Sequence, residues 1–373
     1  MVSDTWLALL QAAQPSPHIW LEALKQCGSA EALNAEPARA LVALGLPAEG
    51  IGKLHGPDEA ELERCRRWLA GPNRGLVTFG SARYPPRLAE IQTAPLALWV
   101  EGPDHALLSA PQLAMVGSRS PTTSGRETAE QFAKYLSARG LTITSGLATG
   151  IDGASHRGAL PEIGGTIAVL GSGPDVIFPR AHERLAAEIV ARGLLVSEFA
   201  PGVEPQKFFF PLRNRVIAGL AVGTLVVEAT RRSGSLITAR WAGDFGREVF
   251  AIPGSIHNPL ARGCHWLIRQ GAKLVEEAAD ILVELAPQLQ LDLAQAPPEA
   301  AADSTDDGGL GDDPTYRKLL NAMDFSPTPI GDLGARVQLT AAELSSMLLI
   351  LELEGLVEAL PGGRYARVGK RKR

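Results

Sequence analysis

Cysteine is scarce in this sequence, and the few cysteines present are not arranged for cross-linking. Cys27, Cys65 and Cys264 are the only three among 373 residues, and they lie far apart. An odd number at such spacing excludes a disulfide framework and the common zinc-binding patterns. We therefore expect reduced thiols in a cytoplasmic protein.

Long apolar runs are also absent. None reaches the roughly 20 residues that a membrane-spanning helix needs. The first residues, which include Asp4, lack the basic start and apolar core of a secretory signal. Hydrophobic residues nevertheless make up 45% of the chain, which is typical of globular domains with full cores. We expect no membrane partner.

Positive charge is in deficit, since the formal net charge is −5. Such a balance alone argues against a polyanionic partner. The deficit is concentrated in residues 286–313, which contain seven Asp and Glu and no Lys or Arg. Residues 111–285 contain 18 Lys and Arg against 16 Asp and Glu. Because local charge decides where a polyanion binds, the central block remains a candidate nucleic-acid-binding region.

Composition divides the chain into five regions. Apolar clusters broken by Pro and Gly predict a small helical, SAM-like domain over residues 1–75. A Rossmann-like domain is expected over 76–285 and a flexible acidic linker over 286–313. Helical spacing followed by two strand-like pieces predicts a winged helix over 314–368, and residues 369–373 form a basic tail.

The central block alternates short apolar runs with helical patterns. Runs that are apolar throughout and separated by helices indicate a parallel sheet covered on both faces. Right-handed crossovers then give an α/β fold with a doubly wound, mostly parallel, Rossmann-like sheet. The expected strands are at 96–102, 113–117, 141–146, 166–171, 194–197, 223–228 and 248–252.

Small residues follow several of these expected strands. Ligands of doubly wound sheets bind beyond the carboxyl ends of the strands, and small residues let backbone N–H groups approach an anion closely. A single such loop is more often just a tight turn, but several at one edge favour an anion site. The candidate anion-binding residues are Gly117, Ser118, Arg119, Ser145, Gly146, Gly171, Ser233 and Gly234.

Patterns for cofactors, metals and catalysis are missing. The segment from Gly171 to Val176 lacks the third glycine of a dinucleotide fingerprint, and neither a P-loop nor a Gly-x-Ser-x-Gly elbow occurs. Asp152 and His156 could share a helix face, but no third metal ligand is in view, and Asp152 is better explained as a helix N-cap. We expect no cofactor, no metal and no catalytic residue.

Three consecutive aromatics lie in the cationic segment Lys207-Phe208-Phe209-Phe210-Pro211-Leu212-Arg213-Asn214-Arg215. They cannot all face one side of a helix or strand, so at least one should meet solvent or a ligand. Rings beside cations suit unpaired bases and their phosphates. We therefore select Lys207, Phe210, Arg213 and Arg215 as candidate DNA-binding residues. In the alternative, the rings are core and the arginines form structural ion pairs, for which Glu228 is the expected partner.

The winged helix lacks the charge that duplex DNA requires. Its expected recognition helix, about 340–354, carries Glu343, Glu352 and Glu354 and no Lys or Arg. A helix in the major groove faces dense phosphate charge and normally brings cations. We expect this domain to contact protein or to have a structural role.

The central block resembles the DNA-processing protein A family (DprA, also called Smf). The resemblance rests on ordered motifs between about residues 80 and 285 and is looser in the flanking domains. The matching segments are Val116-Gly117-Ser118-Arg119, Ser145-Gly146-Leu147-Ala148-Thr149-Gly150-Ile151-Asp152-Gly153, Phe210-Pro211-Leu212-Arg213-Asn214-Arg215-Val216-Ile217-Ala218-Gly219, Val226-Val227-Glu228-Ala229 and Ser233-Gly234-Ser235-Leu236-Ile237-Thr238-Ala239.

The resemblance implies a non-enzymatic role in natural transformation. Members of the family bind incoming single-stranded DNA, protect it and help load the RecA recombinase, and they dimerise through the Rossmann-like domain. The family's DNA-contacting residues fall on Arg119, Lys207 and Phe210. Two alternatives stay open: a Rossmann-like nucleotide-processing enzyme and a duplex-binding winged-helix protein. The candidate dimer-interface residues are Ile256, Leu260, Leu267 and Ile268.

Overall fold

The computed structural model describes residues 3–14 and 17–289, together with part of the C-terminal region. Of residues 290–373 it describes positions 319, 323, 328, 329, 333, 344, 347, 348, 351, 352, 356–360 and 364–367. The chain divides into two compact units, 1–296 and 297–373. In the described part of the chain, no helix combines the length and apolarity that crossing a membrane demands.

Among the described residues, six helices precede the sheet. Their bounds are α1 Asp4–Ala12, α2 Pro17–Cys27, α3 Ala30–Ala35, α4 Ala38–Ala43, α5 Ala48–His55 and α6 Glu59–Leu69. Asp58 caps α6 by accepting from the N–H groups of Ala60 and Glu61. Leu62, Cys65 and Trp68 of α6 pack with Trp99 of the sheet. The N-terminal helices therefore share a core with the sheet that follows them.

Nine strands form one sheet in the order β1-β2-β6-β5-β4-β3-β7-β8-β9. Their bounds are β1 Arg74–Thr78, β2 Ala97–Glu101, β3 Gln112–Val116, β4 Thr142–Ser145, β5 Thr166–Leu170, β6 Leu194–Ser197, β7 Gly223–Val226, β8 Glu248–Ala251 and β9 Lys273–Leu274. The seven adjacent strands β6, β5, β4, β3, β7, β8 and β9 are parallel to one another. β2 pairs antiparallel with both β6 and β1. The predicted mostly parallel α/β sheet is confirmed.

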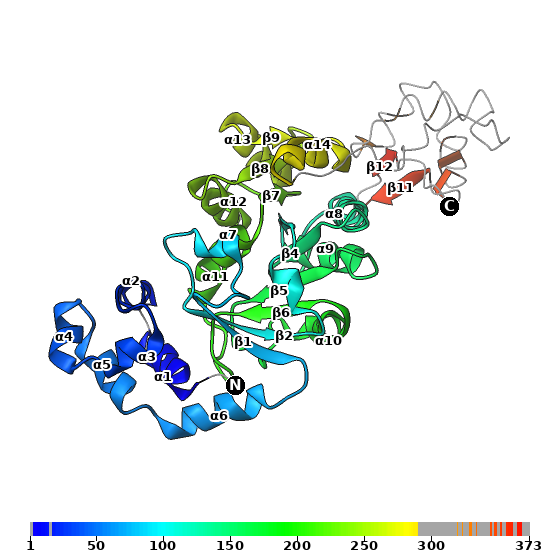
Figure 1. Ribbon diagram of the computed structural model, residues 1–373. Coiled ribbons are helices and arrows are strands. Elements are labelled where there is room, and N and C mark those ends of the chain that lie inside the picture. Colours follow the sequence, from blue (N-terminus) through cyan, green and yellow to red (C-terminus); the bar gives the residue numbers. More distant parts are fainter. Residues whose placement is uncertain are drawn as a thin grey trace. The chain divides into compact units, whose positions relative to one another are not determined.

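Helices cover both faces of the sheet (Figure 1). On one side lie α8 Thr123–Ser137, α9 Ile151–Ala159 and α10 Glu183–Arg192, with α14 Ala278–Leu289 against α8. On the other lie α7 Pro86–Ala89, α11 Phe209–Leu220, α12 Ser235–Asp244 and α13 Arg262–Arg269. Short 3-10 helices occur at His105–Leu108, Arg180–His182 and Pro259–Ala261.

The central strand β3 supplies both cores. Leu113 and Met115 pack with the apolar side of α8, whereas Ala114 and Val116 pack with α11 and α12. Successive side chains of a strand point to opposite faces, so an uninterrupted apolar run fits a strand that is covered twice. This explains why the strands of the block could be recognised without an alternating pattern.

The C-terminal unit has its own small core. A three-stranded sheet runs in the order β10-β12-β11, with bounds Thr328–Pro329, Arg364–Arg367 and Val357–Leu360. Leu344, Met347, Leu348 and Leu351 are helical and buried, with the spacing that the sequence predicts. Of the three glutamates predicted on this helix, Glu352 is exposed, and Glu343 and Glu354 lie outside the described residues. The predicted basic tail, residues 369–373, also lies outside them.

Candidate functional site

A pocket of about 680 Å³ opens at the point where the sheet reverses its winding. From β3 the chain winds through β4, β5 and β6 in one direction, and from the adjacent β7 it winds through β8 and β9 in the other. The loops that leave the carboxyl ends of β3 and β7 therefore diverge and leave a crevice between them. This is where a doubly wound sheet most readily holds a ligand.

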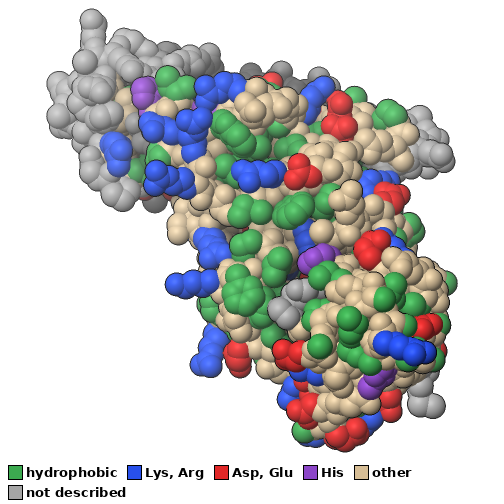
Figure 2. Space-filling view, turned by 90° about the vertical axis from the view of Figure 1, so that its left-hand side faces the viewer, with side chains coloured by type: hydrophobic (Ala, Val, Ile, Leu, Met, Phe, Trp, Pro, Cys, Tyr) green, Lys and Arg blue, Asp and Glu red, His purple; other side chains and the backbone are tan. Residues whose placement is uncertain are grey.

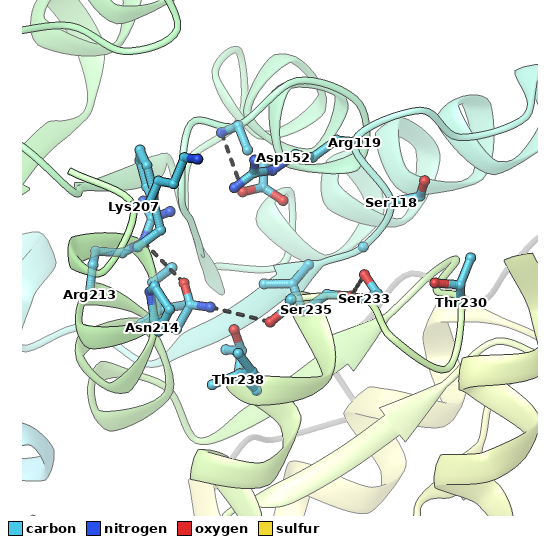
Figure 3. A pocket seen from close by; sticks show the side chains of 18 of the residues that line it. Ser118, Arg119, Asp152, Lys207, Arg213, Asn214, Thr230, Ser233, Ser235 and Thr238 are labelled. Atoms are coloured by element: carbon cyan, nitrogen blue, oxygen red, sulfur yellow. Dashed lines mark hydrogen bonds between the residues drawn. The ribbon is translucent and has the colours of Figure 1, made fainter. Parts of the chain in front are cut away.

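Five segments line this pocket (Figure 3). They are the loop after β3, the loop after β4 with the first turn of α9, the loop after β5 that carries Phe178, the stretch from Lys207 into α11, and the loop from β7 with the first turn of α12. Phe210, Arg213, Asn214 and Ile217 are spaced by three and four residues, so one face of α11 forms a wall. Of the predicted site residues, those that line the pocket are Gly117, Ser118, Arg119, Lys207, Phe210, Arg213, Ser233 and Gly234.

Two cations stand at the rim. Arg119 and Lys207 are exposed, and neither has an acidic partner within 4 Å among the residues that the structure describes. The Arg119 guanidinium lies over the Phe210 ring, 5.6 Å from its centroid. Its loop is held by two bonds: the Ile151 N–H donates to the Ser118 carbonyl, and the Thr149 hydroxyl donates to the Arg119 carbonyl. Arg119 is thus held in position, and among the described residues neither cation is neutralised by a carboxylate.

Charged side chains are unevenly distributed over the molecular surface, and basic ones predominate over the sheet domain (Figure 2). Figure 2 shows most of the visible acidic side chains at the lower end of the molecule, over the N-terminal helices. Lys and Arg predominate over the middle and upper parts of the same face. A net negative chain can therefore present a positive potential over its sheet domain.

The three consecutive phenylalanines have three environments. Phe208 is 58% exposed, Phe209 packs against Phe199, and Phe210 is half-buried in the pocket. The prediction that at least one of the rings meets solvent is confirmed. Gly171 lies behind Phe210, where a Cβ atom would come within 2.9 Å of the ring. Gly171 therefore positions the ring without lining the pocket.

Arg213 forms the floor of the pocket. Its side chain is buried and donates to the carbonyls of Gly146, at 2.7 Å, and Val169. Burial lowers the pKa of Arg213 to about 10, against the opposing effect of Asp152. A Cβ at Gly146 would lie 2.7 Å from the guanidinium carbon, so only glycine lets the two segments approach this closely. Arg213 remains charged at neutral pH.

Asp152 is not the helix N-cap that the sequence suggested. Gly150 precedes the first turn of α9, and Asp152 lies within that turn. Its carboxylate instead accepts hydrogen bonds from the N–H groups of Gly146 and Ala148. It also attracts the Arg213 guanidinium by charge. Burial raises the pKa of Asp152, and Arg213 and the two N–H groups oppose that rise. This carboxylate fixes the loop after β4.

Glu228 is likewise misassigned by the sequence. It was expected to pair with Arg213 or Arg215, but its carboxylate accepts from the N–H and the hydroxyl of Thr122, at 2.9 and 2.7 Å. Arg215 pairs with Glu198, and both side chains are buried. The partner was missed because it lies on another segment, just past β6.

Two further predicted residues lie behind the pocket. Ser145 is buried, and its hydroxyl donates to the Met115 carbonyl across the sheet. Arg215 is on the side of α11 that faces Glu198. Together with Gly146 and Gly171, these four predicted site residues are not among those lining the pocket. The structure gives them contacts that support the walls.

The start of α12 completes the pocket with polar groups. The Ser233 and Ser235 hydroxyls are 2.7 Å apart, and the Asn214 amide reaches the Gly234 carbonyl at 3.4 Å (Figure 3). The Thr238 hydroxyl lines the pocket, is 1% exposed and has no hydrogen-bond partner within the described structure. This hydroxyl adds a polar group to the wall that the start of α12 forms. The positive end of a helix favours an anion there.

Asp152 and His156 do not form a joint site. The Thr166 hydroxyl donates to the Ile143 carbonyl, so His156 Nδ1–H donates to Thr166 Oγ1, at 2.7 Å. Burial lowers the pKa of His156 to about 3, which keeps the ring neutral. Among the residues placed by the structure, no three His, Cys, Asp or Glu side chains form a group that could hold a metal.

Sequence reasoning did not select Phe178, Asn214 or Thr238, all of which line the pocket. Asn214 and Thr238 lie within the motifs that carry the family resemblance. Phe178 has a weaker signal, namely an aromatic residue before proline in the loop after an apolar strand. Its position at the pocket depends on how that loop folds back, which no local pattern reveals.

Comparison with known proteins identifies the architecture. Residues 75–286 match the family model of the DNA recombination-mediator protein A. The chain belongs to this family. Residues 294–363 match the DprA winged-helix domain, so the predicted winged helix is confirmed at the level of the fold. The protein is thus a DNA-processing protein of the recombination-mediator class.

Relatives cover most of the chain. Protein Smf of Escherichia coli K12 is 47% identical over 308 residues, which span 82% of this chain and 81% of that protein. DNA processing protein DprA of Streptococcus pneumoniae is 50% identical over 201 residues, 54% of this chain and 71% of that one.

Solved structures agree with the fold. That of the Streptococcus pneumoniae protein has a TM-score of 0.68 at 37% identity and covers 76% of this chain and 98% of that one. The Helicobacter pylori DNA processing protein A, described with a single-stranded DNA binding mode, has a TM-score of 0.52 at 27% identity. It covers 57% of this chain and 96% of that one.

Proposed function

We propose that this protein binds single-stranded DNA without sequence specificity, protects it and helps load the RecA recombinase during natural transformation. The observation that carries the proposal is the convergence of Arg119, Lys207 and Phe210 on one pocket, with neither cation paired to a carboxylate among the described residues. Cations meet phosphates, and an aromatic face accepts any base. The binding of single-stranded DNA by the Helicobacter pylori relative supports the same reading.

An unpaired strand suits the pocket better than a duplex does. A base must leave its partner before it can stack on Phe210, which is half-buried in a crevice. Phosphates would meet Arg119, Lys207 and the start of α12, where the Ser233 and Ser235 hydroxyls lie. Backbone contacts of this kind carry no sequence information.

The proposed role is non-catalytic. Asp152 lines the pocket and Glu228 lies beside it, and both carboxylates are engaged: Asp152 accepts from two backbone N–H groups, and Glu228 from Thr122. A general base needs a carboxylate that can reach a substrate proton. These two groups instead fix the loops that form the walls.

A homodimer through the Rossmann-like domain and a cytoplasmic location complete the proposal. Among the candidate interface residues, Ile256 is 72% exposed and available to a second copy. Leu260 and Ile268 are half-buried, whereas Leu267 is part of the core. The contact would therefore centre on Ile256.

The test compares Arg119→Ala and Lys207→Ala with wild type on labelled single strands of several sequences. Each variant should bind all sequences more weakly and reduce the slope of log affinity against log salt by about 1, because one phosphate contact is lost. Arg67→Ala, which removes an exposed cation of α6 outside the pocket, is the control. Equal binding by the variants and wild type would contradict the proposal.

The RecA step needs a separate measurement. RecA filament assembly on a single strand that already carries this protein should be faster than on a strand given RecA alone. Unchanged or slower assembly would show that the protein binds DNA without acting as a loader.

A further inference from the structure

Phe178 is an exposed ring at the mouth of the pocket. It is 45% exposed and is one of the lining residues. Its centroid lies 5.5 Å from that of Phe210, and the two planes are tilted by 38°. Single exposed apolar residues are common on protein surfaces and need no explanation. A second ring in contact with the expected stacking residue does need one.

The loop that carries Phe178 is held in place. The Ser172 hydroxyl donates to the Val176 carbonyl at 2.6 Å, and the Gly173 N–H donates to the Val203 carbonyl at 2.8 Å. The Asp175 carboxylate accepts from the Gly202 N–H at 2.7 Å. The last two bonds tie the loop to the segment that leads to Lys207. A fixed ring stacks on a base without first losing conformational entropy.

Phe210 alone offers little ring surface. It is half-buried, Gly171 lies against one edge, Phe178 contacts it, and the Arg119 guanidinium lies over it. Phe178 has the larger free surface of the two rings, because its outer part faces solvent. Single-strand-binding grooves place successive bases on successive aromatic side chains.

We propose that Phe178 forms a second base-stacking subsite, which takes an unpaired nucleobase next to the base held at Phe210. This subsite rests on the proposed binding of single-stranded DNA. Its ligand is a base of the same strand whose phosphates meet Arg119 and Lys207. The two rings and the two cations then form one continuous surface along which a strand of any sequence can lie.

The test uses the full-length protein with Phe178→Ala and a labelled oligo(dT) strand. Loss of one stacked base should weaken binding about 5- to 150-fold, and Phe178→Trp should bind at least as tightly as wild type. Phe208→Ala is the matched control, because it removes an even more exposed ring that does not line the pocket. That variant should change the affinity less than about twofold if only pocket rings stack.

A second strand separates stacking from distortion of the loop. On an oligonucleotide with abasic sites in place of bases, Phe178→Ala and wild type should bind equally. If Phe178→Ala bound oligo(dT) as tightly as wild type does, the subsite would be overturned. It would also be overturned if Phe178→Ala lost as much affinity for the abasic strand as for oligo(dT). If wild type itself failed to bind oligo(dT), the proposed function would fall and the subsite with it. Wild-type binding unaffected by Phe178→Ala would remove only the subsite.

Discussion

Four cations near the pocket divide into two pairs with opposite environments. Arg119 and Lys207 are exposed at the rim and have no acidic partner in the described part of the protein. Arg213 and Arg215 are 5% and 6% exposed, and both make hydrogen bonds or ion pairs within the protein. Arg213 donates to backbone carbonyls, and Arg215 pairs with Glu198.

The contrast shows that residue type alone does not assign a role here. A buried guanidinium that lost its partners would be costly, so Arg213 and Arg215 are committed to stability. An exposed cation retains its hydration and can exchange it for a phosphate at little cost. The rim should therefore control DNA affinity, and the buried pair should control the free energy of unfolding.

Arg215→Ala should have the largest effect on stability. It leaves the Glu198 carboxylate buried without its partner, which should lower the free energy of unfolding by about 3–5 kcal/mol. Urea denaturation measures the change, and the double variant Arg215→Met, Glu198→Leu should recover most of the loss. A single variant as stable as wild type would break the contrast between buried and exposed cations.

A conservative exchange sharpens the same contrast. Arg213→Lys cannot reach both carbonyls with one ammonium group, so the free energy of unfolding should fall by about 1–3 kcal/mol. Arg119→Lys should change it by less than about 0.5 kcal/mol, because this position is exposed. Thermal or urea unfolding measures both changes. Comparable losses of stability in the two variants would show that Arg119 at the rim also stabilises the fold.

His156 extends the comparison to pH. Its pKa of about 3 lies below the ordinary value of 6.5, so as pH falls the unfolded chain takes up the proton first. The neutral imidazole therefore contributes its full share to the free energy of unfolding above about pH 6.5. Between about pH 6.5 and pH 3 this share falls by about 1.4 kcal/mol for each pH unit.

The variant His156→Asn keeps a donor for Thr166 but does not titrate. Urea unfolding between about pH 7 and about pH 5 should therefore give a shallower pH slope for His156→Asn than for wild type. Identical slopes would mean that the buried imidazole does not contribute to the acid sensitivity of the fold.

The sequence was sufficient for most of the sheet and for the rim of the pocket. Strands covered on both faces are rich in apolar residues, so β2 through β8 could be recognised from composition, although β4 also buries Thr142, Thr144 and Ser145. β1 was missed because it is largely half-buried and begins with Arg74 and Gly75, and β9 because it has two exposed residues. The helix α14 continues to Leu289, past residue 285 where the central domain was expected to end.

Long-range contacts account for the remaining differences. Arg213 and Arg215 look like the rim cations in sequence, and only the helical path of α11 turns them toward carbonyls and Glu198. Glu228 was assigned to the wrong partner because Thr122 lies 106 residues away. Phe178 could not be placed beside Phe210 without the fold of its loop.

The most direct test of the pocket as a single-strand site is a gel-shift series with wild-type protein on single-stranded and duplex oligonucleotides of equal length at rising salt. A cationic, ring-bearing crevice predicts tighter binding to the single strand at every salt concentration, with log affinity falling linearly as log salt rises. Equal or tighter binding to the duplex would contradict it.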